Sequence, residues 1–271
     1  MIENIILPAL GEMRVAEVGH DGIARLHGSL KATRYRANRV LALLSKMMNL
    51  AVQPWKLRTD NPTKGVVRFP EDRRERWLSA DELRRLSDAL DAVPSQRAAN
   101  AIRLLILTGA RRSEVLKAEW RDIDFDQKRW IKPSAHTKQK KTEYVPLSAP
   151  ALALLAAMKE QAVPGVRFVF PGDGHGPLQD IRKTWLAACA AAGIEGVRLH
   201  DLRHTYASHL VSSGLSLEIV GRLLGHTQVA TTKRYAHLAD SPLREATERF
   251  AAMVASRGTA EIVPLERERK G

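Results

Sequence analysis

The stretch HDLRHT, residues 200–205, places two imidazoles and a guanidinium at the start of a predicted helix. His200 and His204 are four residues apart, a spacing that also brings two zinc ligands onto one helix face. A zinc-binding helix tolerates no fixed cation between its ligands, and Arg203 lies between these two. A zinc site is therefore the weaker interpretation. The other two are a solvated helix end and an anion site in which Arg203 offers its planar fork of donors to a phosphate.

Two other stretches carry residues of related kinds. LTGARRSEVLKAEW contains Arg111, and LLGHTQVATTKRYAHL contains His226 and Tyr235. A tyrosine phenolate can attack phosphorus and stay attached to it, so that a free strand hydroxyl can later reverse the cut. Fixed guanidinium groups would stabilise the extra negative charge on the phosphorus oxygens during the attack. Taken singly, Tyr235 could equally be a half-buried aromatic and Arg111 a surface ion-pair partner.

The motifs TGARxSE, HDLRHT and LGH, followed by a tyrosine nine residues after His226, occur here in one order and spacing. In this combination the chain resembles the tyrosine recombinase, or phage integrase, family over roughly Ser79 to Leu238. The resemblance implies a tyrosine nucleophile, two arginines on the scissile phosphate and two histidines as hydrogen-bond donors or proton carriers. These residues are Tyr235, Arg111, Arg203, His200 and His226.

The resemblance also implies a lysine on a hairpin that protonates the leaving 5′ oxygen. Lys138, which precedes the turn, is the predicted general acid; Lys140 is its main rival, and Lys141 is the third candidate. For each of them the alternative is contact with the DNA backbone without chemistry. Supporting roles are expected for Glu114, which could hold an arginine or cap its own helix, and for Asp201.

The residues next to the two arginines are assigned differently. Arg112 is expected to face solvent, because the family motif places the catalytic arginine two residues after Gly109. His204 follows Arg203 by one residue, or about 100° around a helix. That angle predicts a structural histidine rather than a catalytic one.

The charge balance points to a polyanionic partner. Lysine and arginine number 43 against 30 acidic residues, a net charge of +13, and the isoelectric point is near 10.2. Residues 1–76 carry 14 basic and 8 acidic side chains, so both parts of the chain are basic. This distribution suits a protein that contacts a duplex along its whole length. The predicted partner is double-stranded DNA at attachment-type sites, with accessory DNA-bending proteins as further candidates.

Residues 32–52, ATRYRANRVLALLSKMMNLAV, have the periodicity of a long amphipathic helix. Its basic side chains are either solvated or turned toward phosphates, and the composition favours the second interpretation. The predicted DNA-binding residues are Arg34, Arg36, Arg39 and Lys46, together with Lys140 and Lys141 of the hairpin.

The single cysteine, Cys189, excludes an internal disulfide framework and fits a reducing cytosol. The sequence has no apolar run of 18 residues and no basic leader before its first apolar stretch. We therefore expect a cytoplasmic, nucleoid-associated protein without a membrane span. Neither a phosphate-binding loop nor a carboxylate metal cluster is visible, so no cofactor and no metal are expected.

The predicted fold class is mainly α with a small antiparallel sheet. Ser79 and Glu82 form a capping box that opens a helix, several later helices end at a glycine, and β-like runs flank the polar turn AHTKQKKT. By resemblance, residues 1–70 form a partial helical core-binding domain that lacks its first helix. A linker, which begins at TDNPTKGVVRFPEDRRER, leads to about residue 77, residues 78–258 form the catalytic domain, and 259–271 are a charged tail.

Three functions compete. The first is site-specific strand exchange through a 3′-phosphotyrosine, in the integration or excision of a mobile element, by a free monomer that forms a tetramer on DNA. The second is relaxation of DNA by a type IB topoisomerase-like reaction, which rejoins the same strand. The third is DNA binding without catalysis by an integrase-derived protein, which predicts loss of Tyr235 or of an arginine; none is lost.

Overall fold

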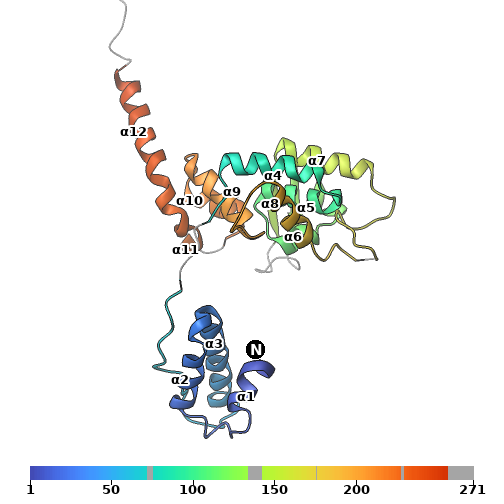
Figure 1. Cartoon of the computed structure of the whole chain (residues 1–271). Helices are drawn as coiled ribbons and strands as arrows, with labels where there is room; N and C mark the ends of the chain where they lie inside the picture. Colours follow the sequence, from blue (N-terminus) through green and yellow to red (C-terminus); the bar gives the residue numbers. More distant parts are fainter. Residues whose placement is uncertain (72–75, 134–141, 175, 227–228, 256–271) are drawn as a thin grey trace, which may run out of the picture. The chain divides into compact units, whose positions relative to one another are not determined.

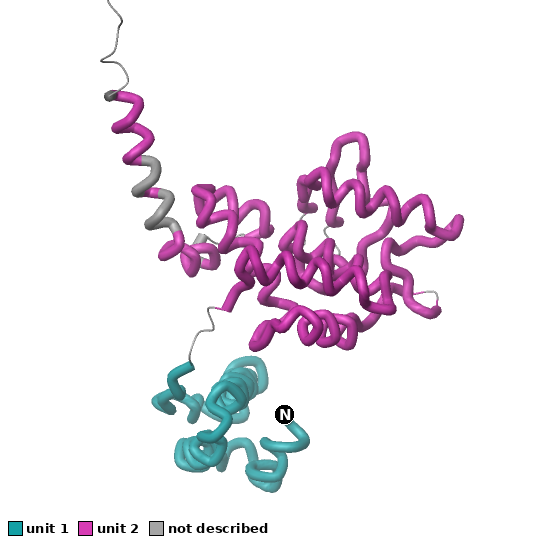
Figure 2. Tube along the Cα trace, turned by 45° about the horizontal axis from the view of Figure 1, so that its top comes forward, with its two compact units in different colours: residues 1–75 teal, residues 76–271 magenta. Residues whose placement is uncertain are grey.

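Two units divide the chain, Met1–Glu75 and Arg76–Gly271 (Figure 2). The computed structural model describes residues 1–71, 76–133, 142–174, 176–226 and 229–255. The predicted charged tail, 259–271, lies outside the described residues.

The first unit is helical. Its elements are η1 (Ile2–Ile6), α1 (Leu7–Leu10), α2 (His20–Ser29), η2 (Lys31–Thr33) and α3 (Arg34–Val52). The predicted amphipathic helix is confirmed as α3, whose buried face includes Val40 and Leu44 and packs against Ile23 of α2. Burying each such side chain stabilises the unit by about 1.5–3 kcal/mol before entropy is counted.

The segment after α3 packs more tightly than its composition predicts. The sequence predicts a linker from residue 59, but Asn61 and Thr63 are buried, and the Asn61 amide donates to the Ser45 carbonyl at 3.2 Å. Further on, Asn38 of α3 exchanges hydrogen bonds with the backbone of Phe69. This segment is held by hydrogen bonds of side-chain amides and not by a periodic apolar face. A pattern based on hydrophobicity therefore does not predict its order.

The second unit is built mainly of helices (Figure 1). They are α4 (Ala80–Ala92), α5 (Gln96–Thr108), α6 (Arg112–Leu116), α7 (Ala149–Glu160), α8 (Arg182–Ala191), α9 (Asp201–Ser212), α10 (Leu217–Leu223), α11 (Val229–Thr232) and α12 (Asp240–Ala255), with the short turns η3 (Trp120–Asp122) and η4 (Lys233–Ala239). The central helix is α5, which packs against α4, α6, α7, α8 and α9. Its apolar residues Ile102, Leu104 and Leu105 are buried in the main core.

A three-stranded antiparallel sheet follows η3, as the sequence predicts. Its strands are β1 (Ile123–Asp124), β2 (Arg129–Lys132) and β3 (Glu143–Pro146), in the order β1-β2-β3. Trp130 pairs with Ile123 on one side and with Val145 on the other. Because side chains alternate along a strand, Trp130 and Lys132 both face the interior.

The helix boundaries agree with the local signals. Ser79 accepts from the backbone N–H of Glu82 while the Glu82 carboxylate accepts from that of Ser79, which confirms the capping box. Gly193, Gly214 and Gly225 follow α8, α9 and α10 with positive φ values of 63°, 94° and 64°, the conformation that glycine adopts without strain.

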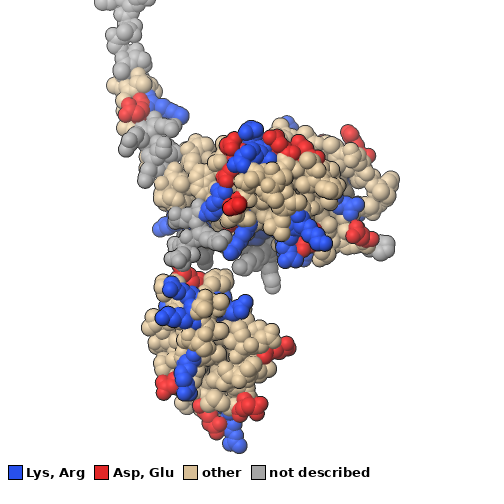
Figure 3. All heavy atoms as spheres, in the orientation of Figure 1, with Lys and Arg blue, Asp and Glu red and all other residues tan. Residues whose placement is uncertain are grey.

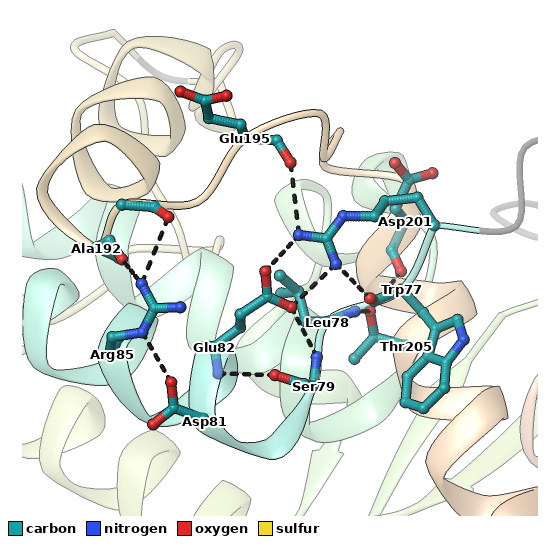
Figure 4. A network of polar contacts seen from close by, with 12 residues as sticks. Trp77, Leu78, Ser79, Asp81, Glu82, Arg85, Ala192, Glu195, Asp201 and Thr205 are labelled. Atoms are coloured by element: carbon teal, nitrogen blue, oxygen red, sulfur yellow. Dashed lines mark hydrogen bonds and ion pairs between the residues drawn. The ribbon is translucent and has the colours of Figure 1, made fainter.

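A polar network fixes the start of α9 against α4 (Figure 4). The backbone N–H of Leu78 donates to Thr205 Oγ1 at 3.0 Å, and Thr205 Oγ1 in turn donates to the Asp201 carbonyl. On the other side of α4, Arg85 is hydrogen-bonded to the Ala192 carbonyl after α8. The helix that carries HDLRHT is therefore anchored at its first turn from outside the site.

Candidate functional site: two arginines, a buried tyrosine and its histidine

Arg203 connects the three motif stretches. It lies on α9 with 5% of its surface exposed, and its guanidinium donates to the Gly109 carbonyl at 2.9 Å and to the Leu224 carbonyl at 2.5 Å. Gly109 is two residues before Arg111, and Leu224 is two residues before His226. One buried side chain therefore holds the loops that carry the other two motifs.

Gly109 is required at the end of α5. Its φ of +60° is left-handed, and a Cβ there would lie 2.5 Å from Cδ1 of Tyr206 on α9. Only a residue without a side chain allows α5 to stop here with its last carbonyl facing Arg203. The glycine of the TGAR motif is therefore explained by close helix packing.

Glu114 organises Arg111. Its Oε1 accepts from the Arg111 guanidinium at 2.6 Å, and its Oε2 accepts from the Arg111 backbone at 3.1 Å and from Lys132 Nζ at 2.8 Å. Burial raises the pKa of Glu114, but the charge of Lys132 and the hydrogen bonds from both cations outweigh it and hold that pKa below its ordinary value. Glu114 thus combines both alternatives that the sequence offered: it holds the arginine and caps α6.

Lys132 is a site residue that sequence reasoning missed. It is 3% exposed, lies over the Trp130 ring, and its Nζ is 3.5 Å from Glu143 Oε2 across the sheet. The strand alternation that points Trp130 inward also points Lys132 inward, and this was the signal available in the sequence. The ion pair of Lys132 with Glu143 joins the last residue of β2 to the first residue of β3.

The base of the hairpin also lies beside the loop of His226. A Cβ on Gly225, which has a φ of +64°, would lie 2.4 Å from the Glu143 carboxylate. Close approach of β3 therefore explains this glycine in the LGH motif. The hairpin lysines Lys138, Lys140 and Lys141 lie outside the described residues.

The two histidines assigned to the phosphate have lowered pKa values. Burial, with the charges of Arg203 and Arg111, lowers the pKa of His226 to about 4, and its Nδ1 lies 3.0 Å from Thr232 Oγ1. Burial and Arg203 also lower the pKa of His200. Both imidazoles are therefore neutral near pH 7, each with one donor and one acceptor nitrogen.

Arg203 keeps its charge although burial, and the repulsion of Arg111, lower its pKa to about 10. Arg111 also lowers the pKa of His226, as described above, so the charged groups of all three motifs act on one another. Arg112, by contrast, is exposed, as predicted. The structure brings Arg111, Arg203, His200 and His226 into one electrostatic neighbourhood.

Tyr235 is 5% exposed and packs in a small cluster with Ala207, Val211, Val220 and Leu224, between α9, α10 and η4. Its hydroxyl lies 2.5 Å from Nδ1 of His204. Burial raises the pKa of Tyr235, partly offset by the charges of Arg234 and Arg203. A neutral phenol beside a neutral imidazole is the arrangement near pH 7.

His204, which the sequence predicts to be a structural histidine, lies within hydrogen-bond distance of Tyr235. Its ring lies 5.2 Å from that of His200 in an edge-on arrangement, because residues four apart share a helix face. The rotation of about 100° from Arg203 turns His204 toward η4, the element that carries the tyrosine. The spacing of His200 and His204 in the sequence indicates that the two imidazoles share a helix face. That this face meets the tyrosine follows only from the position of η4 in the structure.

The remaining predicted residues have simpler surroundings. Asp201 is buried, and its carboxylate accepts from the Arg198 backbone at 2.8 Å, which closes the turn before α9. On α3 the side chains of Arg34, Arg36, Arg39 and Lys46 are exposed. Figure 3 shows lysine and arginine side chains at several places on the visible face of each unit, with acidic side chains among them.

Residues 76–241 match the model of the phage integrase family. The chain belongs to this family. Its integrase relative from Salmonella phage P22 is 31% identical over 219 residues, which cover 76% of this chain and 54% of that protein. Tyrosine recombinase XerC of Staphylococcus aureus is 28% identical over 215 residues, covering 70% of this chain and 67% of XerC. The chain thus spans about half the length of the phage P22 relative.

Solved structures agree on the fold. A lambda integrase dimer bound to a COC′ core site has a TM-score of 0.69 at 21% identity and covers 84% of this chain and 85% of that one. The Tn1549 transposon integrase bound to transposon right end DNA has a TM-score of 0.72 at 17% identity, with 92% and 91% covered. These likenesses show the mainly α fold with its small antiparallel sheet.

The described part of the chain lacks two further features. No helix there is long and apolar enough to cross a membrane. Nor do three or more histidine, cysteine, aspartate or glutamate side chains gather there in a way that could hold a metal ion.

Proposed function

We propose that this chain is a site-specific DNA recombinase that cuts and rejoins strands through a 3′-phosphotyrosine at Tyr235, in the integration or excision of a mobile element. The observation that carries the proposal is the double hydrogen bond of Arg203 to the Gly109 and Leu224 carbonyls. It joins the three motif stretches around one buried cation. The relatives, an integrase and a tyrosine recombinase, support the same reaction class.

In the proposed reaction the scissile phosphodiester binds at Arg111 and Arg203. The Tyr235 hydroxyl oxygen attacks phosphorus, the bond from phosphorus to the 5′ oxygen breaks, and the strand's 3′ phosphate becomes joined to the tyrosine. The guanidinium groups stabilise charge that grows on the nonbridging oxygens, an effect worth 10²–10³-fold per donor, roughly. His200 and His226 donate further hydrogen bonds to the phosphate. Glu114 holds Arg111, and Asp201 holds the turn before α9.

The leaving 5′ oxygen takes a proton from Lys138 in this proposal, with Lys140 and Lys141 as rivals. The position of Lys132 and Glu143 at the base of that hairpin supports a role for the loop beside the site. The reaction as written needs no metal ion and no nucleotide, because the phosphotyrosine conserves the bond energy for rejoining. We expect full activity in the presence of EDTA.

We also propose that the protein is a monomer in solution and assembles as a tetramer on two duplexes. Helix α12 exposes Leu243, Phe250, Met253 and Val254, each at 55% or more, which is the kind of apolar surface that a neighbouring copy could cover. A lambda integrase structure in the same family of folds is a tetramer bound to a Holliday junction. Mass measurement with and without DNA tests this, with Phe250→Glu as the variant expected to block assembly.

The test of the reaction is covalent capture. The protein is incubated with a library of nicked duplexes of random sequence, in which the cut releases a short fragment and prevents rejoining. We expect a protein–DNA adduct that survives denaturation, that enriches one sequence, and that disappears in Tyr235→Phe. The matched control is Tyr144→Phe, which removes an exposed hydroxyl on β3 and should leave the adduct unchanged.

The alternative functions give different results. An adduct that persists in Tyr235→Phe overturns Tyr235 as the nucleophile. No adduct in the unaltered protein overturns the phosphotyrosine mechanism and leaves DNA binding alone. If adducts form but strands with different flanks are never exchanged between two captured sites, the reaction is relaxation of the topoisomerase kind. Loss of the adduct with EDTA overturns metal independence.

A further inference from the structure

His204 is the residue in direct contact with the reactive atom of the site. Its Nδ1 is 2.5 Å from the Tyr235 hydroxyl, and the rings are 6.0 Å apart and tilted by 50°. No role for His204 follows from the motifs, since the HDLRHT pattern assigns His200 and Arg203. In the part of the chain that the structure describes, the Tyr235 hydroxyl makes its hydrogen bond with His204.

We infer that His204 is the proton acceptor for Tyr235, and that its Nδ1 lone pair takes the phenolic proton as the tyrosine oxygen bonds to phosphorus. The inference rests on the proposed function and deepens it. In the balanced step, the oxygen–phosphorus bond forms, the bond to the 5′ oxygen breaks, and the phenolic proton moves to His204. The 5′ oxygen receives its own proton from the general acid.

The protonation states suit this direction of transfer. Burial, together with the charges of Arg234 and His200, lowers the pKa of His204 to about 4. Its imidazole is therefore neutral near pH 7 and has an acceptor nitrogen to offer, while the buried phenol keeps its proton until the reaction. A neutral pair has no excess charge to desolvate before DNA binds.

The bound phosphodiester makes His204 a better base. The groups that act on it are Arg234 and Tyr235 from η4, and His200, Asp201 and Arg203 from its own helix. The positive charges among them disfavour the imidazolium, and a phosphate anion at Arg203 offsets that repulsion. The proton affinity of His204 thus rises when the substrate that needs the base arrives.

Charges on the other packed helices are engaged elsewhere. On α10, Glu218 and Arg222 pair with each other at 3.1 Å, and on α5, Arg97 and Arg103 pair with Asp173 and Asp91. The pH response of the tyrosine–histidine pair is therefore set by η4, by α9 and by the incoming phosphate.

The test compares single-turnover adduct formation by the full chain and by His204→Asn, which keeps a polar side chain but cannot accept a proton. Near neutral pH we expect the rate to fall by about 100-fold or more, the usual contribution of a general base. The deficit should shrink as pH approaches the pKa of the phenol, since the phenolate then forms without help. His237→Asn, an exposed histidine on η4, should match the unaltered protein.

An unchanged rate in His204→Asn, or a deficit of the same size at every pH, overturns the inference and leaves the phosphotyrosine mechanism standing. If this variant does not bind DNA or does not fold, His204→Gln is used in the same way. A second measurement needs no variant and no DNA: nitrogen NMR of the unaltered protein should find Nδ1 of His204 without a proton. A protonated Nδ1 that donates to the phenol overturns the inference even if no adduct is ever captured.

Discussion

The arginine side and the tyrosine side of the site are held in different ways. The arginine side comprises Arg111 and Arg203 with the groups that bind them, which are two backbone carbonyls and the buried Glu114; Lys132 in turn donates to Glu114. The tyrosine side is residues 229–239, α11 and η4, where Tyr235 is held by a small apolar cluster and one imidazole. The two arginines proposed to bind the phosphate are thus fixed through several polar bonds, whereas the proposed nucleophile has few.

The difference has a physical reason. Preorganised charges stabilise a transition state because they do not have to reorient during the reaction. A nucleophile that becomes joined to DNA has to travel with the strand, so a lighter hold is appropriate to it. Changes on the arginine side should therefore affect rate and stability together, and changes on the tyrosine side should affect rate first.

The largest effect is expected for Arg203→Lys. A lysine has one nitrogen and cannot bond two carbonyls and a phosphate from a planar fork. Adduct formation should fall by about 10³-fold, measured in single turnover. The control is Arg222→Lys on the exposed face of α10. A loss no larger than the control's would show that Arg203 supports the fold alone.

Next in size is Lys132→Met. It removes one of the cations that hold Glu114 and leaves a buried carboxylate less compensated, so the free energy of unfolding should fall by about 3 kcal/mol in urea denaturation. Adding Glu114→Gln should recover part of the loss, since the carboxylate is then neutral. Equal stability in the single and double variants would contradict the explanation that Lys132 stabilises the fold by compensating the charge of Glu114.

Gly221→Ala tests the tyrosine side. A Cβ at this position on α10 would lie 2.9 Å from Thr232 Oγ1, which is bonded to His226. Displacing α11 should slow adduct formation by about tenfold, since small misplacements of reacting groups are costly. Gly28→Ala, whose Cβ meets nothing within 4 Å on α2, should leave the rate unchanged. If both variants react alike, the position of α11 does not control the tyrosine.

Stability should depend on pH through the two half-buried imidazoles of His204 and His226. His204 and His226 have folded pKa values of about 4, below the 6.5 of a free histidine. The unfolded chain therefore binds more protons in between, and the free energy of unfolding should fall by about 2 kcal/mol as pH drops from about 7 to 5. Glu82, whose ion pair with Arg76 lowers its pKa from 4.5 to about 2, adds its loss as pH falls through the interval between those two values. His226→Gln should make the slope shallower, and an unchanged slope would mean that His226 is not the group that titrates.

The smallest effect is expected far from the site. Glu82→Gln weakens the capping box of α4 and its ion pair with Arg76, and should cost about 1 kcal/mol of unfolding free energy. Asp88→Asn on the same helix removes an exposed contact of 3.6 Å with Arg84 and should leave the thermal midpoint unchanged. If Asp88→Asn lowered the thermal midpoint more than Glu82→Gln does, the exposed ion pair and not the capping box would be what stabilises α4.

Local signals in the sequence predicted much of the fold. The period of residues 32–52, the capping box at Ser79 and the glycines after α8, α9 and α10 act within a few residues, so they determined helices that the structure confirms. The packing of residues 61–71 escaped them, because it depends on Asn38 and Asn61, which bond to backbone far along the chain.

By itself, the sequence determined the family, the helix boundaries and the residue types that a phosphate and a nucleophile would need, because those are encoded in short motifs and charge. Only the tertiary structure decided which neighbours these residues have. It placed His204 rather than His200 on the tyrosine, and Lys132 beneath Glu114. Both contacts join elements more than 15 residues apart, and no local spacing fixes how a strand or a turn packs against a helix.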